Sequence, residues 1–555
     1  MDPNPDPSRP RPVSGARPAP VRATPTHTAP GAPSSTSVRT AATTQGPGRD
    51  RGATGATGKR FKTRHLSMMA LGSAIGAGFF LGTGVAVSEA GPAVLVSYVL
   101  AALLAISVMY ALAELAAALP STGSFSTYAE AGIGRWAGFT VGWLYWFTLI
   151  MVLGMEITGA AGIFVNWFPA VPQWTVALVI VVVLGGVNLL AAGDFGEVEA
   201  WLAGIKVFTI VAFLAIGIGL VTGIIPGRPE SVVDNVLGHG GWAPHGLAGI
   251  AVGLLAIITS FGGIEIVTIA AAESEEPQRA MGQAIRSVIW RILVFYVGSV
   301  VLMICLLPWN SEEMRTNPFA SVLDMAGIPA VGRIMEAVVF IALVSAFSAN
   351  IYASSRMAYS LSARGMGARW LLGGAGVPTS AQGVPAEVSP GVRRADGTVG
   401  TLDDAPVDED DVRSVVAHEG ASGDLSRGRT PRRAVSVSIA LALVSVGLNW
   451  WLPEALLGIL LNAIGMSLLV VWLFVVVSQM RLHPTLVRDG TLAIRMPGWP
   501  WLGWLVLAGL GAIGVLMAWS PSGRPQLIGA AVLTALIAGL YTVRQHWGLR
   551  RAARG

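Results

Sequence analysis

Long apolar runs separated by short polar connections dominate the chain from about residue 66 onward. Each run has the roughly 20 residues that a helix needs to cross a bilayer. The pattern predicts an all-α integral membrane protein with twelve transmembrane helices. These spans, numbered one to twelve, are 66–89, 93–119, 132–165, 173–192, 198–223, 246–271, 287–308, 331–362, 434–452, 455–480, 500–519 and 525–545.

The composition agrees with a membrane protein and excludes a soluble enzyme. Of the 555 residues, 53% are hydrophobic and only 12% are charged, whereas soluble proteins carry about 25% charged residues. The mean hydropathy is +0.61. A single cysteine, Cys305, excludes an internal disulfide.

Two polar segments divide the chain. Residues 1–64, rich in Pro, Ala, Thr, Gly and Arg, are predicted to form a disordered cytoplasmic tail. Residues 370–430, which contain an acidic run, are predicted to form a flexible cytoplasmic loop insertion. The helical core with spans one to eight then occupies 65–369, spans nine to twelve occupy 431–545, and 546–555 form the cytoplasmic C-terminus.

The distribution of Lys and Arg predicts the orientation in the membrane. Of the 37 basic residues, 32 fall on the side that holds both termini and four fall on the opposite side. Basic residues concentrate on the cytoplasmic side of membrane proteins. Both termini are therefore predicted to be cytoplasmic, in a multi-pass protein of the cytoplasmic membrane, and the net charge of +5 does not indicate a nucleic-acid partner.

Spans one and six contain glycines where a membrane helix should continue. Gly72, Gly76 and Gly78 lie within seven residues of span one, and Gly262 and Gly263 lie in span six. Irregular backbone is tolerated in the bilayer only where it faces protein or a water-filled cavity, although close helix packing also selects glycine. If spans one to five and six to ten form an inverted repeat, the interruptions are equivalent and point to a transporter substrate site.

Ionisable residues inside spans are functional candidates. They are Glu114, Glu156, Lys206, Glu265 and Glu336. Lys206 either exchanges a proton during transport or forms a static pair, and the sequence leaves both open. Glu265 is interpreted as bridging the broken helix and Glu114 as a packing or gating residue, whereas Glu156 and Glu336 receive no role.

An ordered series of motifs resembles the amino acid–polyamine–organocation superfamily, and within it the bacterial amino acid transporter family. The motifs are GSAIGAGFFLGTG from Gly72, GEVEAWLAGIKV around Lys206, SFGGIEIVTIAAAES from Ser260 and SVIWRILVFY from Ser287. The strings of spans six and seven are most similar to the γ-aminobutyrate permease branch. The resemblance covers about residues 60–545 apart from the 370–430 insertion.

The resemblance implies a fold of five plus five inverted helices, with helices one and six broken and two helices added. It implies import of amino acids coupled to protons, with no cofactor and no metal. Lys206 resembles a lysine that takes the place of a sodium ion in related members, which implies proton coupling. The residues implied at the substrate are Ala74, Ala77 and Gly78 for the carboxylate, Thr259, Ser260 and Gly262 for the amino group, and Phe261 as an occluding ring.

The leading hypothesis is a proton-coupled importer of amino acids, of γ-aminobutyrate or a small neutral amino acid among others, with the substrate, protons and the lipid bilayer as its partners. No nucleic acid and no obligate protein partner is expected. Two alternatives remain: an amino acid exchanger on the same fold, and a nutrient sensor that uses the tail and the 370–430 loop. An intramembrane enzyme is disfavoured, because the sequence has no His-Glu-x-x-His motif and no paired metal-ligand spacing.

Overall fold

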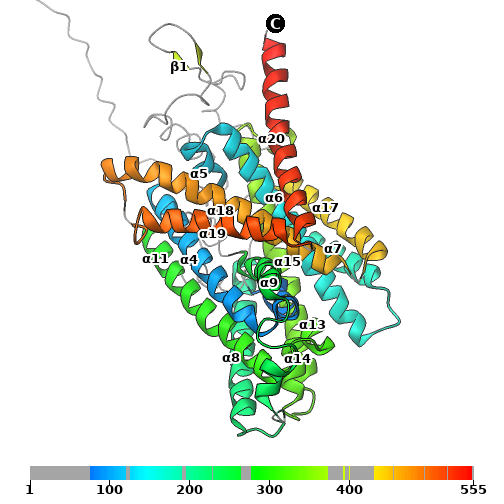
Figure 1. Cartoon of the computed structure of the whole chain (residues 1–555). Helices are drawn as coiled ribbons and strands as arrows, with labels where there is room; N and C mark the ends of the chain where they lie inside the picture. The colour runs from blue at the N-terminus through cyan, green and yellow to red at the C-terminus, as the bar shows by residue number, and fades with distance from the viewer. Residues whose placement is uncertain are drawn as a thin grey trace, which may run out of the picture. The chain divides into compact units, whose positions relative to one another are not determined.

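The apolar segments form α-helices in the computed structural model of the chain (Figure 1). The structure describes residues 75–119, 125–190, 195–227, 229, 231–263, 277–372, 392–393, 399–400, 431–453, 455–492, 494–521 and 523–552. The predicted fold class, an all-α membrane protein, is confirmed.

The first half of the described chain contains ten helices and three short helical turns. Its helices are α2 (Ala77–Phe80), α3 (Gly82–Ala90), α4 (Val94–Ala118), α5 (Phe125–Gly132), α6 (Arg135–Trp167), α7 (Gln173–Leu190), α8 (Phe195–Thr222), α9 (Gly246–Phe261), α11 (Pro277–Arg291) and α12 (Gly298–Leu306). The short turns are η1 (Gly91–Ala93), η2 (Asp234–Gly238) and η3 (Ile292–Val297).

The second half begins with two short helices and continues with long ones. Its helices are α13 (Glu312–Thr316), α14 (Pro318–Asp324), α15 (Val331–Ala363), α17 (Arg432–Trp451), α18 (Leu456–Arg488), α19 (Trp501–Trp519) and α20 (Arg524–Ala552). A short turn η4 (Arg369–Leu372) and the antiparallel strands β1 (Val392–Arg393) and β2 (Val399–Gly400) complete the described elements.

Ten helical stretches of the described residues are long and apolar enough to cross a bilayer. One of them, Ala77–Ala118, combines α2, α3 and α4 and so contains parts of both predicted spans one and two. The apolar helix Gly246–Phe261 is shorter, because it ends inside predicted span six. The count of twelve spans and the inverted repeat stay predictions.

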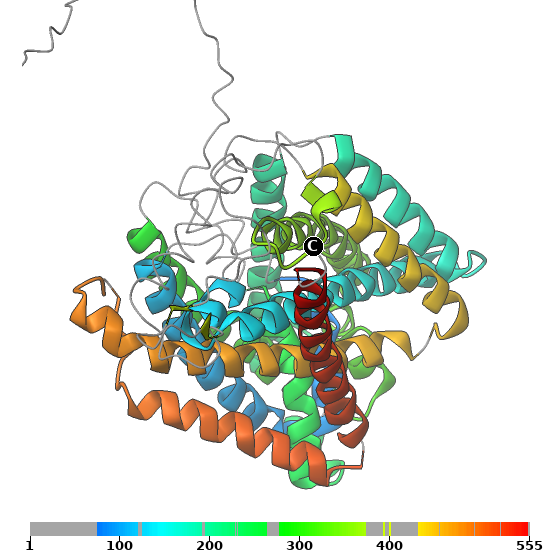
Figure 2. The same ribbon diagram turned by 90° about the horizontal axis from the view of Figure 1, so that it is seen from above.

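Helices α6 and α18 lie at the centre of the packing. In their most apolar windows 72% and 67% of the residues are buried, compared with 17% in α20. A helix that is apolar all round packs inside a bundle or faces lipid. Helix α6 contacts α15, α18 and α5, and α3 contacts α9. Helices α18 and α19 run side by side in both views, and α20 leaves this pair towards the C-terminus (Figures 1 and 2).

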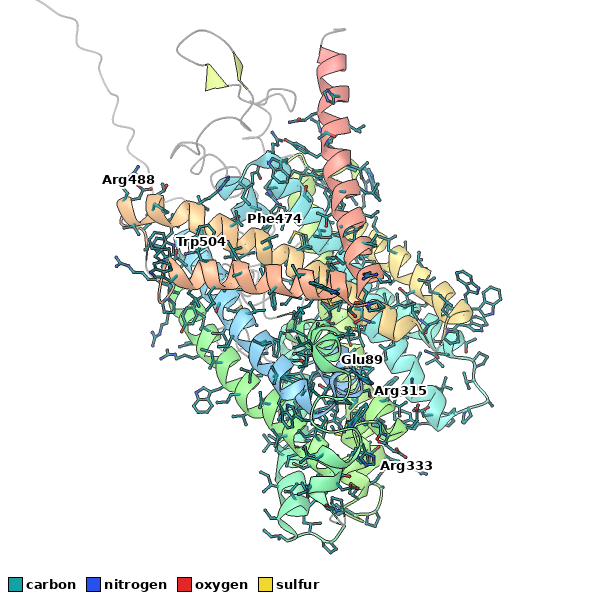
Figure 3. The ribbon with its side chains drawn as sticks, in the orientation of Figure 1. Glu89, Arg315, Arg333, Phe474, Arg488 and Trp504 are labelled. Atoms are coloured by element: carbon teal, nitrogen blue, oxygen red, sulfur yellow. The ribbon has the colours of Figure 1, made fainter. Side chains whose placement is uncertain are left out.

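Charged side chains gather at the two ends of the helices. Figure 3 shows Arg315 and Arg333 towards one end, and Arg488 at the other. Arg315 and Arg333 are two of the four basic residues that are predicted on the side opposite the termini. Arg488 is one of the 32 basic residues that are predicted on the side of the termini. The cytoplasmic orientation itself stays a prediction.

The ends of the predicted 370–430 insertion are held together by a direct contact. Arg433, at the start of α17, donates to the carbonyl of Trp370 in η4, with an N···O distance of 2.9 Å. Arg544 on α20 donates to the carbonyls of Gly365 and Met366 at 2.7 and 2.8 Å. The two ends of the insertion are therefore joined through its first residue, Trp370, and the residues that flank it.

Deleting residues 375–428 and joining the ends through a short Gly/Ser linker is expected to leave the amino acid uptake that the resemblance implies largely unchanged. The ends already lie together, so closing a shorter loop adds little entropic cost. Uptake by cells, normalised to the amount of protein in the membrane, checks this. Loss of uptake with normal membrane insertion would show that the segment takes part in transport.

Candidate functional site

The predicted interruption of span one appears as a helix that starts in mid-span. Helix α2 begins at Ala77, directly after Gly76, whose backbone is extended with φ −135° and ψ −154°. The amide of Ala77 donates to both carboxylate oxygens of Glu156 on α6, at N···O distances of 3.2 and 3.1 Å. The first amides of a helix have no partner within the helix, and here a carboxylate of the protein itself supplies one.

Span six shows the corresponding interruption as the end of a helix. Helix α9 ends at Phe261, and the amide of Gly262 donates back to the carbonyl of Thr259 at 3.1 Å. Gly263 then has φ 93°, a left-handed value at which a side chain is strained. Glycine at this position therefore allows α9 to stop in the middle of the predicted span.

The two interruptions touch each other. A Cβ atom on Gly78 would lie 2.8 Å from the Cα of Ser260 and 2.8 Å from the carbonyl oxygen of Thr259. The hydroxyl of Ser260 donates to the carbonyl of Gly78, and the hydroxyl of Tyr296 donates to the carbonyl of Ser260 at 3.1 Å. The residues implied at the substrate carboxylate and at its amino group thus meet at one point, which only a glycine at 78 permits.

A cavity lies beside this contact, with walls from α2, α6, α9, α15 and α18. Gly76, Gly78, Ser260, Gly263 and Glu156 are among the residues that line it. Its volume is about 30 Å³, more than the roughly 10–15 Å³ that one water molecule needs by the same measure. A ligand much larger than a few water molecules would require the walls to move apart.

Lys206 on α8 lies close enough to this region to interact with Glu156. Its side chain is 1% exposed, and its ammonium interacts electrostatically with the carboxylate of Glu156. Charges inside a bilayer are costly unless they are paired. This electrostatic interaction relates α8 to α6, and the hydrogen bonds of Glu156 relate α6 to the amide of Ala77. A change in the charge of Glu156 would therefore alter the contact at the first interruption.

Glu114 belongs to a separate buried cluster between α4, α18 and the connection to α19. Its carboxylate is fully buried and accepts from Gln479 at 2.8 Å and from the amide of Met496 at 2.7 Å. The ring of His483 shares a further hydrogen bond with it at 2.6 Å and stacks on Trp499. Glu114 does not line the cavity, and its predicted packing or gating role stays a prediction.

Phe261 lies in a buried group of rings, here called the aromatic cluster. The ring centroid of Phe261 is 5.2 Å from that of Tyr296, and Phe261 is not among the residues that line the cavity. The predicted role of Phe261 as an occluding ring stays a prediction. The members of the aromatic cluster are Phe79, Phe80, Tyr98, Phe213, Phe261, Tyr296 and Phe319, each at most 1% exposed.

Glu336, which received no role from the sequence, joins three elements at the start of α15. It accepts from the indole of Trp167 at 2.7 Å and from the amide of Asn317 at 2.6 Å. These contacts hold the end of α6 beside the start of α14. Over the described residues, no group of three or more His, Cys, Asp or Glu side chains is arranged to hold a metal ion.

Three predicted site residues, Gly72, Ala74 and Glu265, lie outside the described residues. The carboxylate contact implied for Ala74 and the bridging role of Glu265 therefore stay predictions. Ala77, Gly78, Thr259, Ser260 and Gly262 all lie where the two interruptions meet.

The part that α6 plays in this site could not be predicted from the sequence. Glu156 was recognised only as an ionisable residue in mid-span. The other α6 residues that line the cavity are Tyr145, Thr148, Leu149, Val152 and Met155, which share one helix face by their spacing of three and four residues. Span three is apolar on every face, so no periodicity marks the one that meets the cavity.

Comparison with known proteins gives one family and several relatives. The model of the amino acid permease family matches residues 65–385 and 420–550. The chain is 43% identical over 498 residues to the aromatic amino acid transport protein AroP of Corynebacterium glutamicum, covering 89% of this chain and 96% of that one. It is 35% identical over 487 residues to the γ-aminobutyric acid permease of Bacillus subtilis, covering 87% and 93%. It is 31% identical over 501 residues to the L-asparagine permease of Salmonella typhimurium, covering 88% and 89%.

Proposed function

The chain belongs to the amino acid permease family, and from this membership we propose that it imports amino acids across the cytoplasmic membrane by symport with protons. It is a multi-pass membrane protein of amino acid transport and not an enzyme. The expected family and its γ-aminobutyrate permease branch are confirmed. The orientation with both termini in the cytoplasm is part of the proposal and rests on the distribution of Lys and Arg.

The observation that carries the proton symport is the position of Glu156. Its carboxylate accepts hydrogen bonds from the amide of Ala77, and the resemblance implies that this amide binds the carboxylate of the substrate. The carboxylate of Glu156 also interacts with the ammonium of Lys206. A substrate carboxylate that takes this amide displaces Glu156. A displaced carboxylate in the bilayer is costly while it is charged.

Protonation of Glu156 removes the cost of a displaced charge, because the protonated carboxyl group is neutral. In the proposed cycle, Glu156 gains a proton from outside as the substrate carboxylate binds at Ala77, with the charge of Lys206 remaining close to both. The substrate and the proton then leave together on the cytoplasmic side, and Glu156 returns to the amide of Ala77. In this cycle the carboxylate of Glu156 takes the place of the substrate carboxylate at Ala77 whenever no substrate is bound, which is consistent with its hydrogen bonds in the structure.

Uptake by the purified protein in lipid vesicles tests the proposal. Vesicles with an alkaline interior are given labelled L-leucine, L-phenylalanine or γ-aminobutyrate, with and without a protonophore. We expect at least one compound to accumulate above its external concentration, and the protonophore to abolish that accumulation. Uptake that the protonophore does not change, but that unlabelled amino acid inside the vesicles accelerates, would contradict symport and establish exchange.

A further inference from the structure

We infer that the substrate is an α-amino acid with an uncharged, apolar side chain, and that γ-aminobutyrate and charged amino acids are rejected. The inference rests on the proposed function, because it takes the cavity at the two interruptions as the substrate site. The three relatives reported above are named for substrates of different chemistry. Relatedness alone therefore does not choose among them, whereas the walls of the cavity do.

The cavity wall that faces the two interruptions is built from hydrocarbon. Leu149, Val152 and Met155 line it from α6, and Leu468 lines it from α18. The ring of Tyr145 packs against Phe125, with a centroid distance of 4.7 Å. A substrate side chain placed between α6 and α18 therefore loses its contact with water and gains mainly apolar contacts, which favours an apolar side chain.

Two of the polar side chains of the wall, Thr148 and Asn350, use a donor within their own helices. The hydroxyl of Thr148 donates to the carbonyl of Leu144 at 2.8 Å, and the amide of Asn350 donates to the carbonyl of Ala346 at 2.9 Å. The hydroxyl proton of Thr148 is thereby used, whereas the amide of Asn350 keeps one further N–H. An acidic or amide side chain of a substrate would find few donors in the described wall, which disfavours such side chains.

Glu156 does not serve as a counter-ion for a cationic side chain, because in the proposed cycle it is protonated while the substrate is bound. The nearby ammonium of Lys206, which interacts electrostatically with Glu156, adds a positive charge instead. Among the described residues that line the cavity, Glu156 is the only Asp, Glu, Lys, Arg or His. The charge of a lysine or arginine substrate would therefore find no partner in the described wall, at a cost that a membrane interior makes large.

The spacing of the two interruptions selects an α-amino acid over a γ-amino acid. Gly78 and Ser260 lie in contact, because even a Cβ on Gly78 would overlap the backbone of Ser260. The groups implied for the carboxylate and for the amino group are therefore adjacent. An α-amino acid carries its two charged groups on a single carbon, whereas γ-aminobutyrate separates them by three methylene groups and cannot reach both partners in an extended form.

The test measures uptake in the same vesicles for five labelled compounds. They are L-leucine, L-phenylalanine, L-alanine, L-lysine and γ-aminobutyrate. Leucine or phenylalanine is expected to be taken up with a kcat/KM about tenfold or more above those of lysine and γ-aminobutyrate. Unlabelled apolar amino acids, but not lysine or γ-aminobutyrate, are expected to compete.

A substitution in the cavity wall tests whether the cavity determines the selectivity for the substrate side chain. Leu149→Trp fills space between α6 and α18, and it is expected to lower the kcat/KM for phenylalanine about tenfold or more while alanine is affected less. Leu536→Trp on α20, where the leucine is 62% exposed, is the matched control and should leave both rates unchanged. An equal loss for alanine and phenylalanine would show that Leu149 does not contact the side chain, and would overturn the inference.

The outcomes separate the inference from the proposed function. Gradient-driven uptake of γ-aminobutyrate or lysine at a rate equal to that of leucine would overturn the inference and leave proton-coupled import intact. If none of the five compounds accumulates in vesicles with a verified gradient, the proposed function fails and the inference fails with it.

Discussion

Replacing Gly78 by leucine is expected to abolish transport while the protein still inserts into the membrane. A Cβ at this position would lie 2.8 Å from both the Cα of Ser260 and the carbonyl oxygen of Thr259. Backbone atoms cannot turn aside as a flexible side chain can, so the two interruptions must separate. A displacement of about 1 Å at a reacting or binding site costs on the order of hundredfold in rate, and we expect a loss of at least that size in vesicle uptake.

Gly162 on α6 provides the control for this substitution. A Cβ on Gly162 would meet no atom within 4 Å, so Gly162→Leu adds the same side chain to a transmembrane glycine without a clash. Thermal unfolding in detergent should show both variants folded. If Gly78→Leu folds and transports at the rate of Gly162→Leu, the contact between the interruptions is not the substrate site.

Replacing Lys206 by methionine is expected to stop accumulation against a gradient, with exchange of labelled for unlabelled amino acid retained. The change removes the ammonium that interacts with Glu156 and preserves most of the hydrocarbon volume. A charged Glu156 would then stand unbalanced in the bilayer, so the step in which it gives up its proton is expected to fail. Uptake under an imposed proton gradient and counterflow without a gradient measure the two activities separately.

Glu156→Gln completes this test. Glutamine keeps an oxygen that can accept from the amide of Ala77 but has no ionisable proton. We expect this variant also to exchange without accumulating, and its exchange rate to change little with pH. Full accumulation by Lys206→Met would instead remove the lysine from the coupling mechanism and leave it a structural role.

The interruptions could be predicted from the sequence because their cause is local. Glycine at 76 and at 263 allows backbone conformations that other residues rarely adopt. In a bilayer, such a local change appears as the start or the end of a helix. Helix α2 accordingly begins at Ala77, and α9 ends at Phe261. The apolar runs were predictable for the same reason, since their length alone relates them to the bilayer.

The partners of the buried charges could not be predicted in this way. Ala77 and Glu156 are 79 residues apart, and Glu114 and Met496 are 382 apart, so these hydrogen bonds depend on how the helices pack. The position of Phe261 in the aromatic cluster has the same origin. The sequence shows that Phe261 borders an interruption, but the direction of its ring is set by Tyr296, which belongs to another helix.

The aromatic cluster also bears on how tightly the proposed symport couples the proton gradient to the import of substrate. At its centre, Phe319 of α14 lies 5.1 and 5.2 Å from Phe79 and Phe80, and 4.8 Å from Phe213, measured between ring centroids. Phenyl rings offer no strong hydrogen-bonding groups, and tightly packed apolar constrictions exclude water. Phe79 and Phe80 follow Ala77, whose amide donates to Glu156, by two and three residues. In the proposed symport a proton that enters without a substrate would be a leak, and these packed rings would hinder the water file that such a leak requires.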